Sequence, residues 1–513
     1  MLKIFKKETT IFILLSLIFL TLSYISLIYS FINTPPDSVF LATDNYYLDY
    51  HQYLSEIAQG QSGDIFLFNK FTTEPHQSIF LRPILPLSGF ILAPFKLPPH
   101  LIYHLLKIIT TILFFISTYY FISLFLKAKN QRLFSFFLIF ASASFPKVLF
   151  RENIEIYTFF NWWTSTSLSS RISFLPHHNL ANLLLITTLI LLYKSTNSKK
   201  LLYPASLITF FLSFSTPTYV ILLLFFYFAY QIYQLKITKI QLNNLIFNCL
   251  KFTFIPAFGL LYTYLSHQKP PWKQINDWVS SQSYNIQLHE YLLSFGPIII
   301  LGLIGIILLI KAKNNQYSFP LIFTFSFFIL LTSLTIFPNL INPIRLIEVP
   351  ISIFFSLFAI YFLKNLKTNL PVYKITAILI ILISLPAYKI NFLDPITTPP
   401  HYLGKDIYQA FSFLKNQGGK DDTVFCSSSY CSLIPAYTNK FVYQAHPVST
   451  LNFIQKQQLA SQYFSLAPAQ AKNFLIKNNI SYLFIQDQST QNHPFLKKIF
   501  GSPQIVIYKL IVD

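Results

Sequence analysis

The sequence predicts a polytopic α-helical membrane protein that ends in a small α/β domain. Apolar runs of membrane-spanning length recur along the first three quarters of the chain, and a polar tail of about 125 residues follows the last run. Only 11% of the 513 residues are charged, whereas 53% are hydrophobic. Soluble globular chains carry about 25% charged residues. This composition therefore excludes an ordinary soluble protein.

Each predicted span follows from the roughly 20 apolar residues that a bilayer core requires. The first run follows Lys3, Lys6 and Lys7, lacks a small-residue cleavage site and is predicted to be an uncleaved signal anchor. Eleven spans are expected, at 11–32, 101–126, 133–150, 179–193, 201–214, 217–234, 244–265, 291–310, 318–336, 349–363 and 370–388. The segments 201–214 and 217–234 form either one kinked helix or a short hairpin, which leaves the count open by one or two.

The distribution of basic residues predicts the orientation, because cytoplasmic loops are enriched in Lys and Arg. With the N-terminus inside, the inner segments hold fifteen Lys and Arg and one acid, Glu8. The formal net charge of +20 is thus mainly a topology signal and does not indicate a nucleic-acid partner. We expect a transmembrane domain at 1–388, with a long first outer loop at 33–100, and an extracytoplasmic domain at 389–513. Within the loop, 82–98 is apolar, contains several prolines and predicts a helix at the membrane interface.

The tail alternates helical and strand patterns, which predicts the α/β fold of the C-terminal domain. Helices are expected at 405–416, 449–464 and 467–478, and strands at 423–426, 482–485 and 504–510. Cys426 and Cys431 either close a small disulfide in an oxidising outer compartment or remain free thiols. Four-ligand cysteine spacing is missing, which disfavours a cysteine zinc site. No Gly-rich phosphate loop is found.

Ionisable residues gather on the predicted outer side, where seventeen of the eighteen acids lie. The densest group contains Asp44, Asp49 and His51, shortly after the first span, and Glu74 and His76 follow in the same loop. A carboxylate near the low-dielectric membrane boundary can have a raised pKa and act as a general base. A second carboxylate can orient an acceptor or hold a divalent metal ion. Each acid can equally be a solvated loop residue or a helix cap.

Two stretches carry a resemblance to a known family. The first contains Asp44-x-x-Tyr47, Ile57-x-Gln59-Gly60, Gly63 and Asn69-x-Phe71-Thr72-x-Glu74-Pro75, and the second contains Ile434-Pro435-Ala436-Tyr437-Thr438, Val442-Tyr443, His446-Pro447 and Thr450. Together with the span order and the outer tail, they resemble the GT-C class of membrane glycosyltransferases. That class includes the protein O-mannosyltransferases and the bacterial aminoarabinose transferases. The motifs cover about sixty residues and do not specify a substrate.

The resemblance implies a polyprenyl-phosphate-linked sugar as donor and an acid of the first outer loop as general base. Asp44 is the residue that matches this base. Many members have two adjacent acids, whereas this chain has Asp44-Asn45, which leaves a directly paired carboxylate in doubt. Glu74 is the second catalytic candidate, for acceptor orientation or metal binding.

A lipid-phosphate donor also requires cations at the outer surface, and arginine binds phosphate bidentately. Arg151, Arg171 and Arg345 lie on the predicted outer side of a chain that otherwise favours lysine. His177 and His178 precede the fourth span and can bind phosphate or metal, or simply belong to a capping loop. With Asp49, His51 and His76, these residues are the substrate-binding candidates.

The sequence therefore favours an inverting GT-C-type glycosyltransferase, transferring a hexosyl or pentosyl group in the cell membrane. Its partners would be the lipid bilayer, a lipid-linked sugar and a glycan, lipid or protein acceptor on the outer face. A transporter or flippase would place ionisable groups at mid-membrane and show repeated halves, and neither is evident. A glycan polymerase for lipid-linked substrates and a non-catalytic membrane scaffold that displays the tail are the remaining alternatives.

Overall fold

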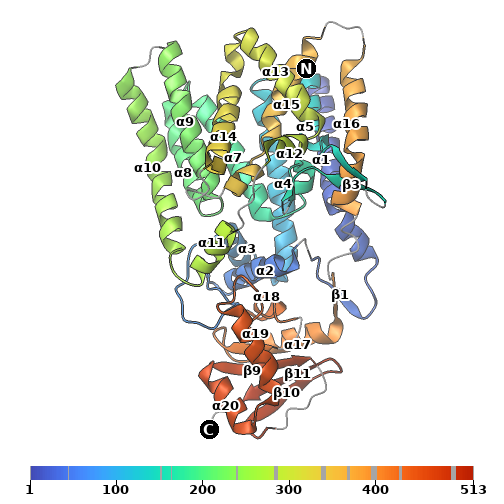
Figure 1. Cartoon of the computed structure of the whole chain (residues 1–513), viewed down its shortest axis with the longest axis vertical. Coiled ribbons are helices and arrows are strands. Elements are labelled where there is room, and N and C mark those ends of the chain that lie inside the picture. The colour runs from blue at the N-terminus through green and yellow to red at the C-terminus, as the bar shows by residue number, and fades with distance from the viewer. Residues whose placement is uncertain are drawn as a thin grey trace. The chain divides into compact units, whose positions relative to one another are not determined.

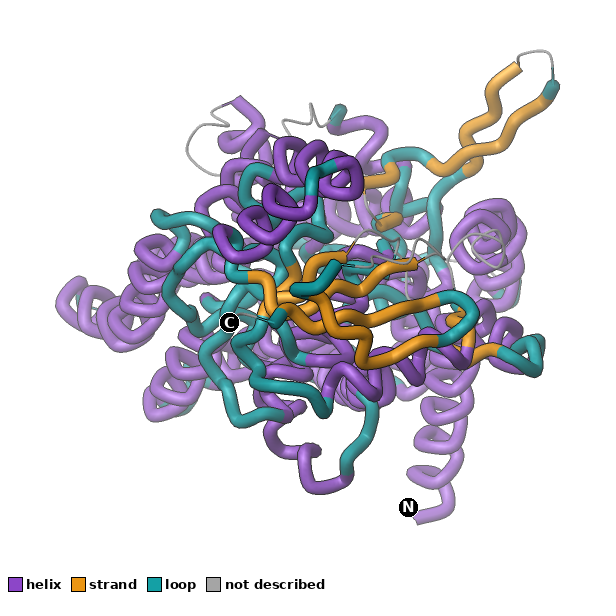
Figure 2. Tube along the Cα trace, turned by 90° about the horizontal axis from the view of Figure 1, so that it is seen from below, coloured by secondary structure: helices purple, strands orange, loops and turns teal. Residues whose placement is uncertain are grey.

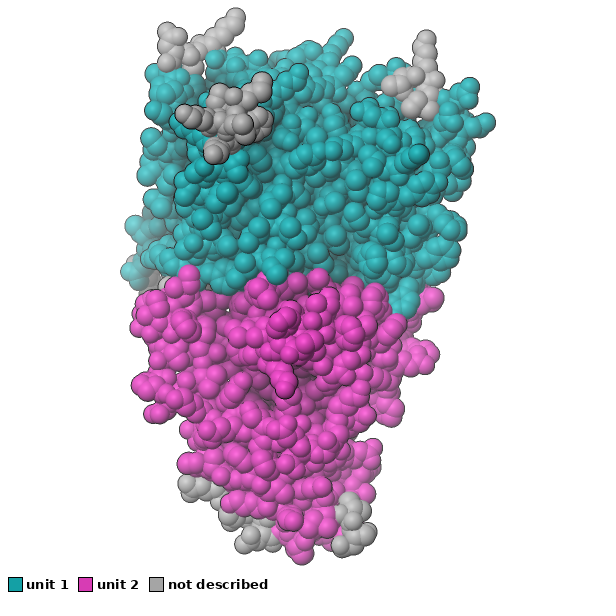
Figure 3. Space-filling view, turned by 180° about the vertical axis from the view of Figure 1, so that it is seen from behind, with its two compact units in different colours: residues 1–26, 107–263, 283–397 teal, residues 27–106, 264–282, 398–513 magenta. Residues whose placement is uncertain are grey.

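The computed structural model separates into two compact units (Figure 3). Unit 1 contains Met1–Ser26, Lys107–Thr263 and Ser283–Thr397, and unit 2 contains Leu27–Leu106, Tyr264–Gln282 and Thr398–Asp513. The structure describes residues 2–43, 46–150, 153–162, 164–238, 241–281, 287–336, 343–366, 370–393, 401–426, 430–486 and 493–511.

Unit 1 is a bundle of apolar helices (Figure 1). Two long helices, α1 (Leu2–Ile32) and α4 (Pro99–Ser123), begin or end in unit 2. The other helices are α5 (Lys129–Ala141), α6 (Leu168–Arg171), α7 (Pro176–Lys194), α8 (Leu202–Ser213), α9 (Pro217–Thr238), α10 (Leu242–Ser266), α12 (Leu288–Leu293), α13 (Pro297–Lys311), α14 (Ser318–Ile336), α15 (Ser352–Lys364) and α16 (Val372–Tyr388). Short helical turns are η2 (Lys199–Leu201), η3 (Asn315–Tyr317), η4 (Pro343–Glu348) and η5 (Lys389–Leu393).

All eleven segments predicted to span the membrane contain a helix. Within the described ranges, six helices are long and apolar enough to cross a membrane, at Lys7–Ile32, Pro99–Ser123, Pro217–Ile237, Leu242–Ser266, Asn315–Ile336 and Val372–Leu393. The chain is therefore a multi-pass membrane protein, while the count of eleven spans and the orientation stay predictions. The two helices α8 and α9 are separate and pack against each other, as a helical hairpin does.

The span predicted at 133–150 is wrong in its second half. Helix α5 ends at Ala141, and strands β2 (Pro146–Phe150) and β3 (Ile154–Thr158) form an antiparallel hairpin that extends away from the helices of unit 1 (Figure 2). Pro146 cannot continue a helix, because it lacks the backbone N–H and clashes with the preceding turn. Ser142 instead donates its hydroxyl to the carbonyl of Phe295. Two further short strands, β4 (Asn161–Trp162) and β5 (Thr164–Ser165), follow the hairpin.

Close helix packing and an ion pair between α1 and α5 help to hold the bundle together. Gly302 and Gly305 of α13 face α15, and a side chain at Gly305 would overlap the carbonyl oxygen of Phe358. Small residues let membrane helices approach this closely. On the predicted inner side, Arg132 donates to both carboxylate oxygens of Glu8, at 2.8 and 2.9 Å, and thereby ties α5 to α1.

Unit 2 joins the first loop to the tail. The loop contributes strand β1 (Ser38–Phe40), helices α2 (Tyr47–Gln61) and α3 (Ile84–Leu92) and the turn η1 (Ala93–Phe95), and helix α11 (Trp272–Ser281) joins from a later loop. The predicted apolar helix within 82–98 is therefore present as α3, packed against α2. The tail contributes strands β6 (Tyr402–Gly404), β7 (Thr423–Cys426), β8 (Phe441–Val442), β9 (Ile480–Gln486), β10 (Leu496–Gly501) and β11 (Ile505–Leu510). Its helices are α17 (Lys405–Lys415), α18 (Leu433–Thr438), α19 (Phe453–Gln462) and α20 (Pro468–Lys477). The short turn η7 (Tyr463–Ser465) lies between α19 and α20.

The tail is a mixed α/β fold, as predicted. Five of its six strands form one sheet in the order β10-β11-β9-β7-β8, with β7 parallel to β8 and β9 and the other pairs antiparallel. The buried side chains of β7 and β9 pack with Tyr463 and Leu475 into the core of this fold. Strands β8 and β10 and helix α18 were not predicted, because each is short or polar on one face.

Strand β1 of the first loop pairs antiparallel with β6 of the tail, from Ser38 opposite Gly404 to Phe40 opposite Tyr402. The loop and the tail therefore fold as one body, which the sequence did not indicate. The domain boundary at 388/389 stays a prediction.

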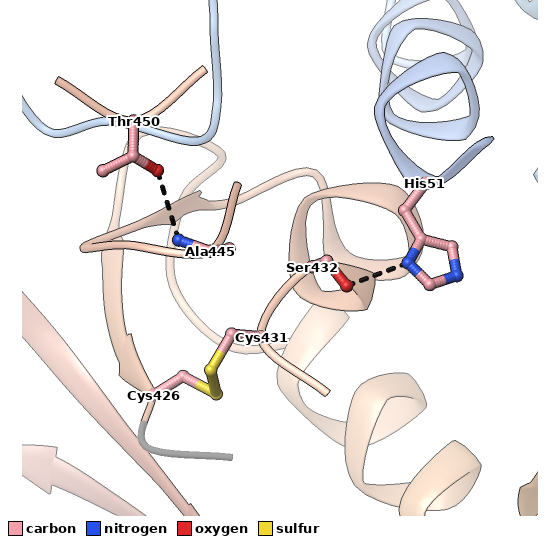
Figure 4. The surroundings of a disulfide bond; sticks show 6 residues. All are labelled: His51, Cys426, Cys431, Ser432, Ala445 and Thr450. Atoms are coloured by element: carbon pink, nitrogen blue, oxygen red, sulfur yellow. Dashed lines mark hydrogen bonds between the residues drawn. A yellow bond between two sulfur atoms is a disulfide. The ribbon is translucent and has the colours of Figure 1, made fainter. Parts of the chain in front are cut away.

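Cys426 and Cys431 form a disulfide within the tail (Figure 4). Of the two states predicted for these cysteines, the structure contains the disulfide and not the free thiols. The bond links the end of β7 to the residue before Ser432, whose hydroxyl contacts His51 of α2.

Candidate functional site

Unit 1 contains a cluster of charged side chains around Glu348. Arg345 and Glu348 lie one turn apart in η4, and Arg345 Nη1 donates to Glu348 Oε1 at 3.1 Å. His178 Nε2 lies 4.0 Å from the other carboxylate oxygen of Glu348. Arg171 is close enough to stabilise the Glu348 carboxylate electrostatically. We call these four residues, Arg171, His178, Arg345 and Glu348, the arginine cluster.

Local structure places Arg171 and His178 together. Arg171 ends the short helix α6, and α7 begins five residues later with Pro176, a residue well suited to a first helical turn. Asn179 bridges the connection, since its amide donates to the carbonyl of Ile172 at 3.0 Å and to Thr111 at 2.9 Å. Lys107, a fully buried cation of α4, donates to the carbonyl of Ser173 at 2.7 Å.

The electrostatics of the arginine cluster favour an anion. Burial raises the pKa of Glu348, but His178, Arg345 and Arg171 together outweigh it and hold that pKa below its ordinary value. Glu348 is therefore ionised at neutral pH. Two guanidinium groups face one carboxylate, so the cluster keeps at least one unit of uncompensated positive charge. Arg345 is about one-third exposed, which leaves part of its guanidinium open to a ligand.

Two tyrosines adjoin the arginine cluster. Tyr219, at the start of α9, donates to Asn182 at 3.1 Å. Tyr291 of α12 is fully buried, and its hydroxyl has no hydrogen-bond partner among the residues described. Arg171 acts electrostatically on both hydroxyl groups. A buried hydroxyl without a partner is costly, and it marks a place where a ligand atom or water can bind.

Of the two adjacent histidines, only His178 joins the arginine cluster. His177 is buried, and the two rings stand edge to face with centroids 4.6 Å apart. The two rings therefore pack against each other, and the contact with Glu348 is made by His178.

Unit 2 contains a second polar group, which joins the first loop to the tail. Asp49 lies in the first turn of α2, and His446 Nε2 of the tail lies 3.3 Å from its Oδ1. His51 is buried, with Nδ1 2.9 Å from the hydroxyl of Ser432 (Figure 4). Burial, with a smaller contribution from His446, lowers the pKa of His51 to about 3, so this ring is neutral.

Glu74 and His76 take part in contacts within unit 2. Lys456 donates to Glu74 at 2.9 Å, and Thr72 donates to the same carboxylate. Burial raises the pKa of Glu74, but these hydrogen bonds outweigh it and the net pKa is lowered. His76 Nε2 accepts the backbone N–H of Asn69 at 2.9 Å. An ionised, partnered Glu74 is suited to holding the loop against the tail.

Asp44 and Arg151 lie outside the described residues, so their roles stay predictions. The structure brings Arg171, His178 and Arg345 together in unit 1. In unit 2, Asp49 and His51 do not contact each other but are both near His446. Within the described ranges, no group of three or more His, Cys, Asp and Glu side chains is placed to hold a metal ion.

Sequence reasoning missed Glu348 and His446. The spacing Arg345-x-x-Glu348 is the signal that could have identified Glu348, because residues three apart share a helical face. His446 was quoted only as part of a motif, and nothing in the sequence placed it beside Asp49.

The chain has the fold of the GT-C class of membrane glycosyltransferases, as the sequence predicts. The oligosaccharyltransferase AglB of Archaeoglobus fulgidus, solved with an inhibitory peptide and a dolichol-phosphate, matches with a TM-score of 0.54 and 13% identity. That match covers 94% of this chain and 70% of AglB. The mycobacterial arabinofuranosyltransferase AftD matches 98% of this chain, which spans 40% of AftD, with a TM-score of 0.53 and 11% identity.

ArnT from Cupriavidus metallidurans, bound to undecaprenyl phosphate, covers 97% of both chains with a TM-score of 0.49 and 10% identity. No protein-family model matches the chain, and no curated protein sequence matches it. The likeness is thus one of fold.

Proposed function

We propose that the chain is a glycosyltransferase that moves a sugar from a polyprenyl-phosphate donor to an envelope acceptor on the outer face. The arginine cluster is the observation that carries this proposal. The leaving group of such a reaction is a lipid phosphate, and guanidinium groups bind phosphate with paired hydrogen bonds. AglB, whose fold this chain resembles, was solved with a dolichol-phosphate.

In the proposed reaction, Asp44 accepts the proton of the acceptor hydroxyl. The acceptor oxygen forms a bond to the anomeric carbon, and the bond from that carbon to the phosphate oxygen breaks. Arg171 and Arg345 hold the phosphate that departs, and His178 adds a hydrogen bond. Glu348 orients Arg345. Electrostatic stabilisation of the departing group supplies much of the rate enhancement in such a step.

Binding of undecaprenyl phosphate to the detergent-solubilised protein tests the donor site. Arg171→Lys and Arg345→Lys should each weaken the affinity about tenfold or more, because loss of a hydrogen bond to a charged group costs about 1.5–3 kcal/mol. Arg132→Lys is the matched control, since Arg132 also pairs with a glutamate in unit 1. If Arg171→Lys, Arg345→Lys and Arg132→Lys all bind undecaprenyl phosphate with the same affinity, the arginine cluster is not part of the donor site.

Transfer in membranes supplied with an undecaprenyl-phosphate-linked sugar tests the base. Asp44→Asn should abolish transfer and leave undecaprenyl phosphate binding intact. Full transfer by both Asp44→Asn and Asp44→Ala would exclude Asp44 as the base. Translocation of the lipid across vesicles without any transfer would instead favour a flippase.

A further inference from the structure

Asp49 and His446 form a polar pair whose geometry is fixed from the tail side. The imidazole Nδ1 of His446 accepts the backbone N–H groups of Val448 and Ser449, at 3.1 and 3.2 Å. A nitrogen that accepts hydrogen bonds carries no proton, so the neutral ring carries its proton on Nε2. That Nε2–H donates to Asp49 Oδ1, 3.3 Å away.

The loop that carries His446 is rigid. Thr450 Oγ1 accepts the backbone N–H of Ala445 at 3.2 Å (Figure 4). It also accepts the backbone N–H of His446 at 3.2 Å and donates to the carbonyl of Phe71 at 2.7 Å. The Phe71 ring packs edge to face against the imidazole, with centroids 5.9 Å apart. The His446 side chain is only 6% exposed. Its orientation is therefore set before any ligand arrives.

The side chain of Asp49, unlike that of His446, is exposed to solvent. Its side chain is 41% exposed, and its Oδ2 has no hydrogen-bond partner among the residues that the structure describes. Arg82 of unit 2 acts electrostatically on Asp49, but its Nε and Nη2 both donate to the buried Glu56. Among the described residues, Asp49 forms no ion pair with a lysine or arginine side chain. A held carboxylate with a free oxygen is suited to accepting hydrogen bonds from hydroxyl groups.

We propose that Asp49 binds a hydroxyl group of a carbohydrate acceptor and that His446 is its positioning residue. This inference rests on the proposed glycosyltransferase function and gives the tail a direct part in it. Because a neutral imidazole N–H holds the carboxylate without cancelling its charge, Asp49 keeps its full strength as an acceptor of hydrogen bonds. A simple structural staple between α2 and the tail would need neither the exposure nor the charge of Asp49.

The test measures transfer from a panel of undecaprenyl-phosphate-linked [14C]pentoses and hexoses to a titrated extract of envelope glycan. Asp49→Asn keeps an oxygen that His446 can hold but loses the charge. It should raise the half-saturating amount of extract about tenfold, while undecaprenyl phosphate binding and thermal stability stay unchanged. Asp406→Asn is the matched control, because Asp406 also lies in the first turn of a helix in unit 2.

His446 is tested by two substitutions. His446→Gln can still donate to Asp49 and should raise the half-saturating amount threefold or less, whereas His446→Phe should match Asp49→Asn. The double variant of Asp49→Asn with His446→Phe should be no worse than either single variant, because both remove one interaction. His493→Phe, elsewhere in the tail, is the control.

Three outcomes would overturn the inference. Unchanged acceptor saturation in Asp49→Asn would leave Asp49 without a binding role, while the proposed transferase stands. If His446→Phe loses transfer activity only in proportion to its loss of thermal stability, and Asp49→Asn stays fully active, the pair has a purely structural role. Absence of transfer by the wild-type protein with the whole panel would overturn the proposed function, and this inference with it.

Discussion

Lys70 shows how much a single buried charge costs in this protein. Its side chain is 1% exposed, and its ammonium donates to the carbonyl of Lys420 at 2.9 Å and lies 3.9 Å from the centre of the Phe441 ring. Burial lowers the pKa of Lys70 from 10.5 to about 8, against the opposing effect of Asp421.

The stability of the protein should therefore rise with pH on account of Lys70. Between pH 8 and 10.5 the unfolded chain keeps the Lys70 proton and the folded chain loses it, so the free energy of unfolding increases with pH, by up to about 1.4 kcal/mol per unit. Lys70→Met lacks this increase. Thermal unfolding of wild type and variant at pH 7.5, 8.5 and 9.5 measures the difference, with the exposed Lys405→Met as control. A difference that stays constant over this range would contradict the assignment.

At the scale of single residues, the sequence identifies some of the candidate site residues but not the residues that contact them. Arg171 and Arg345 are found by residue type alone, since the chain uses arginine only five times. His446 gains its role only when segments distant in sequence come together, and the contacts of Glu348 beyond Arg345 also form only then. No local pattern encodes that His178 will lie beside Glu348, or His446 beside Asp49.

At the element scale, the crossing of α2 and α3 depends on two glycines. A Cβ at Gly60 would overlap the carbonyl oxygen of Pro86, and a Cβ at Gly89 would overlap the carbonyl oxygen of Ile57. The two helix backbones are thus in direct contact, and α2 carries both Asp49 and His51.

Gly60→Ala and Gly89→Ala should each destabilise unit 2. Backbone atoms cannot move aside as a flexible side chain can, so a cost of about 1–3 kcal/mol, typical of overpacking, is expected. Limited proteolysis within 33–100 and thermal unfolding measure the effect. Gly419→Ala is the control, because the nearest atom to its new Cβ would be 3.9 Å away. Equal protease resistance in all three variants would show that the helices can separate without cost.

Helices and tail strands were largely predictable, because periodicity and length distinguish them. The hairpin of β2 and β3 was not, since an apolar run such as 146–150 reads the same in a helix and in a strand. Pro146 was the available signal. The three-residue strands β1 and β6 could not be paired from sequence, because neither has a pattern that identifies its partner.

At the scale of the whole molecule, the first loop depends on the tail. Besides the β1–β6 pair, Asn69 donates to the carbonyl of Ser449 at 2.7 Å, and the N–H of Val442 donates to the carbonyl of Lys70 at 2.9 Å. Lys456 adds its contacts with Glu74.

Deletion of 398–513 should therefore unfold the first loop as well. Sites within 33–100 should become sensitive to protease, while helices of unit 1 keep their resistance, because their core is separate. Mass spectrometry of the released fragments measures both effects. Full protection of the loop in the truncated chain would show that it folds without the tail.

The pairing of β1 with β6 also sets an order of events during synthesis. The ribosome makes β1 near the start of the chain and β6 only after every helix of the bundle has been made. Strand β1 of the first loop therefore stays unpaired with β6 while the helices of the bundle are inserted into the membrane. A chain that stops before β6 is therefore inserted in the membrane without a folded unit 2, so activity that requires this unit begins only after the tail has been made.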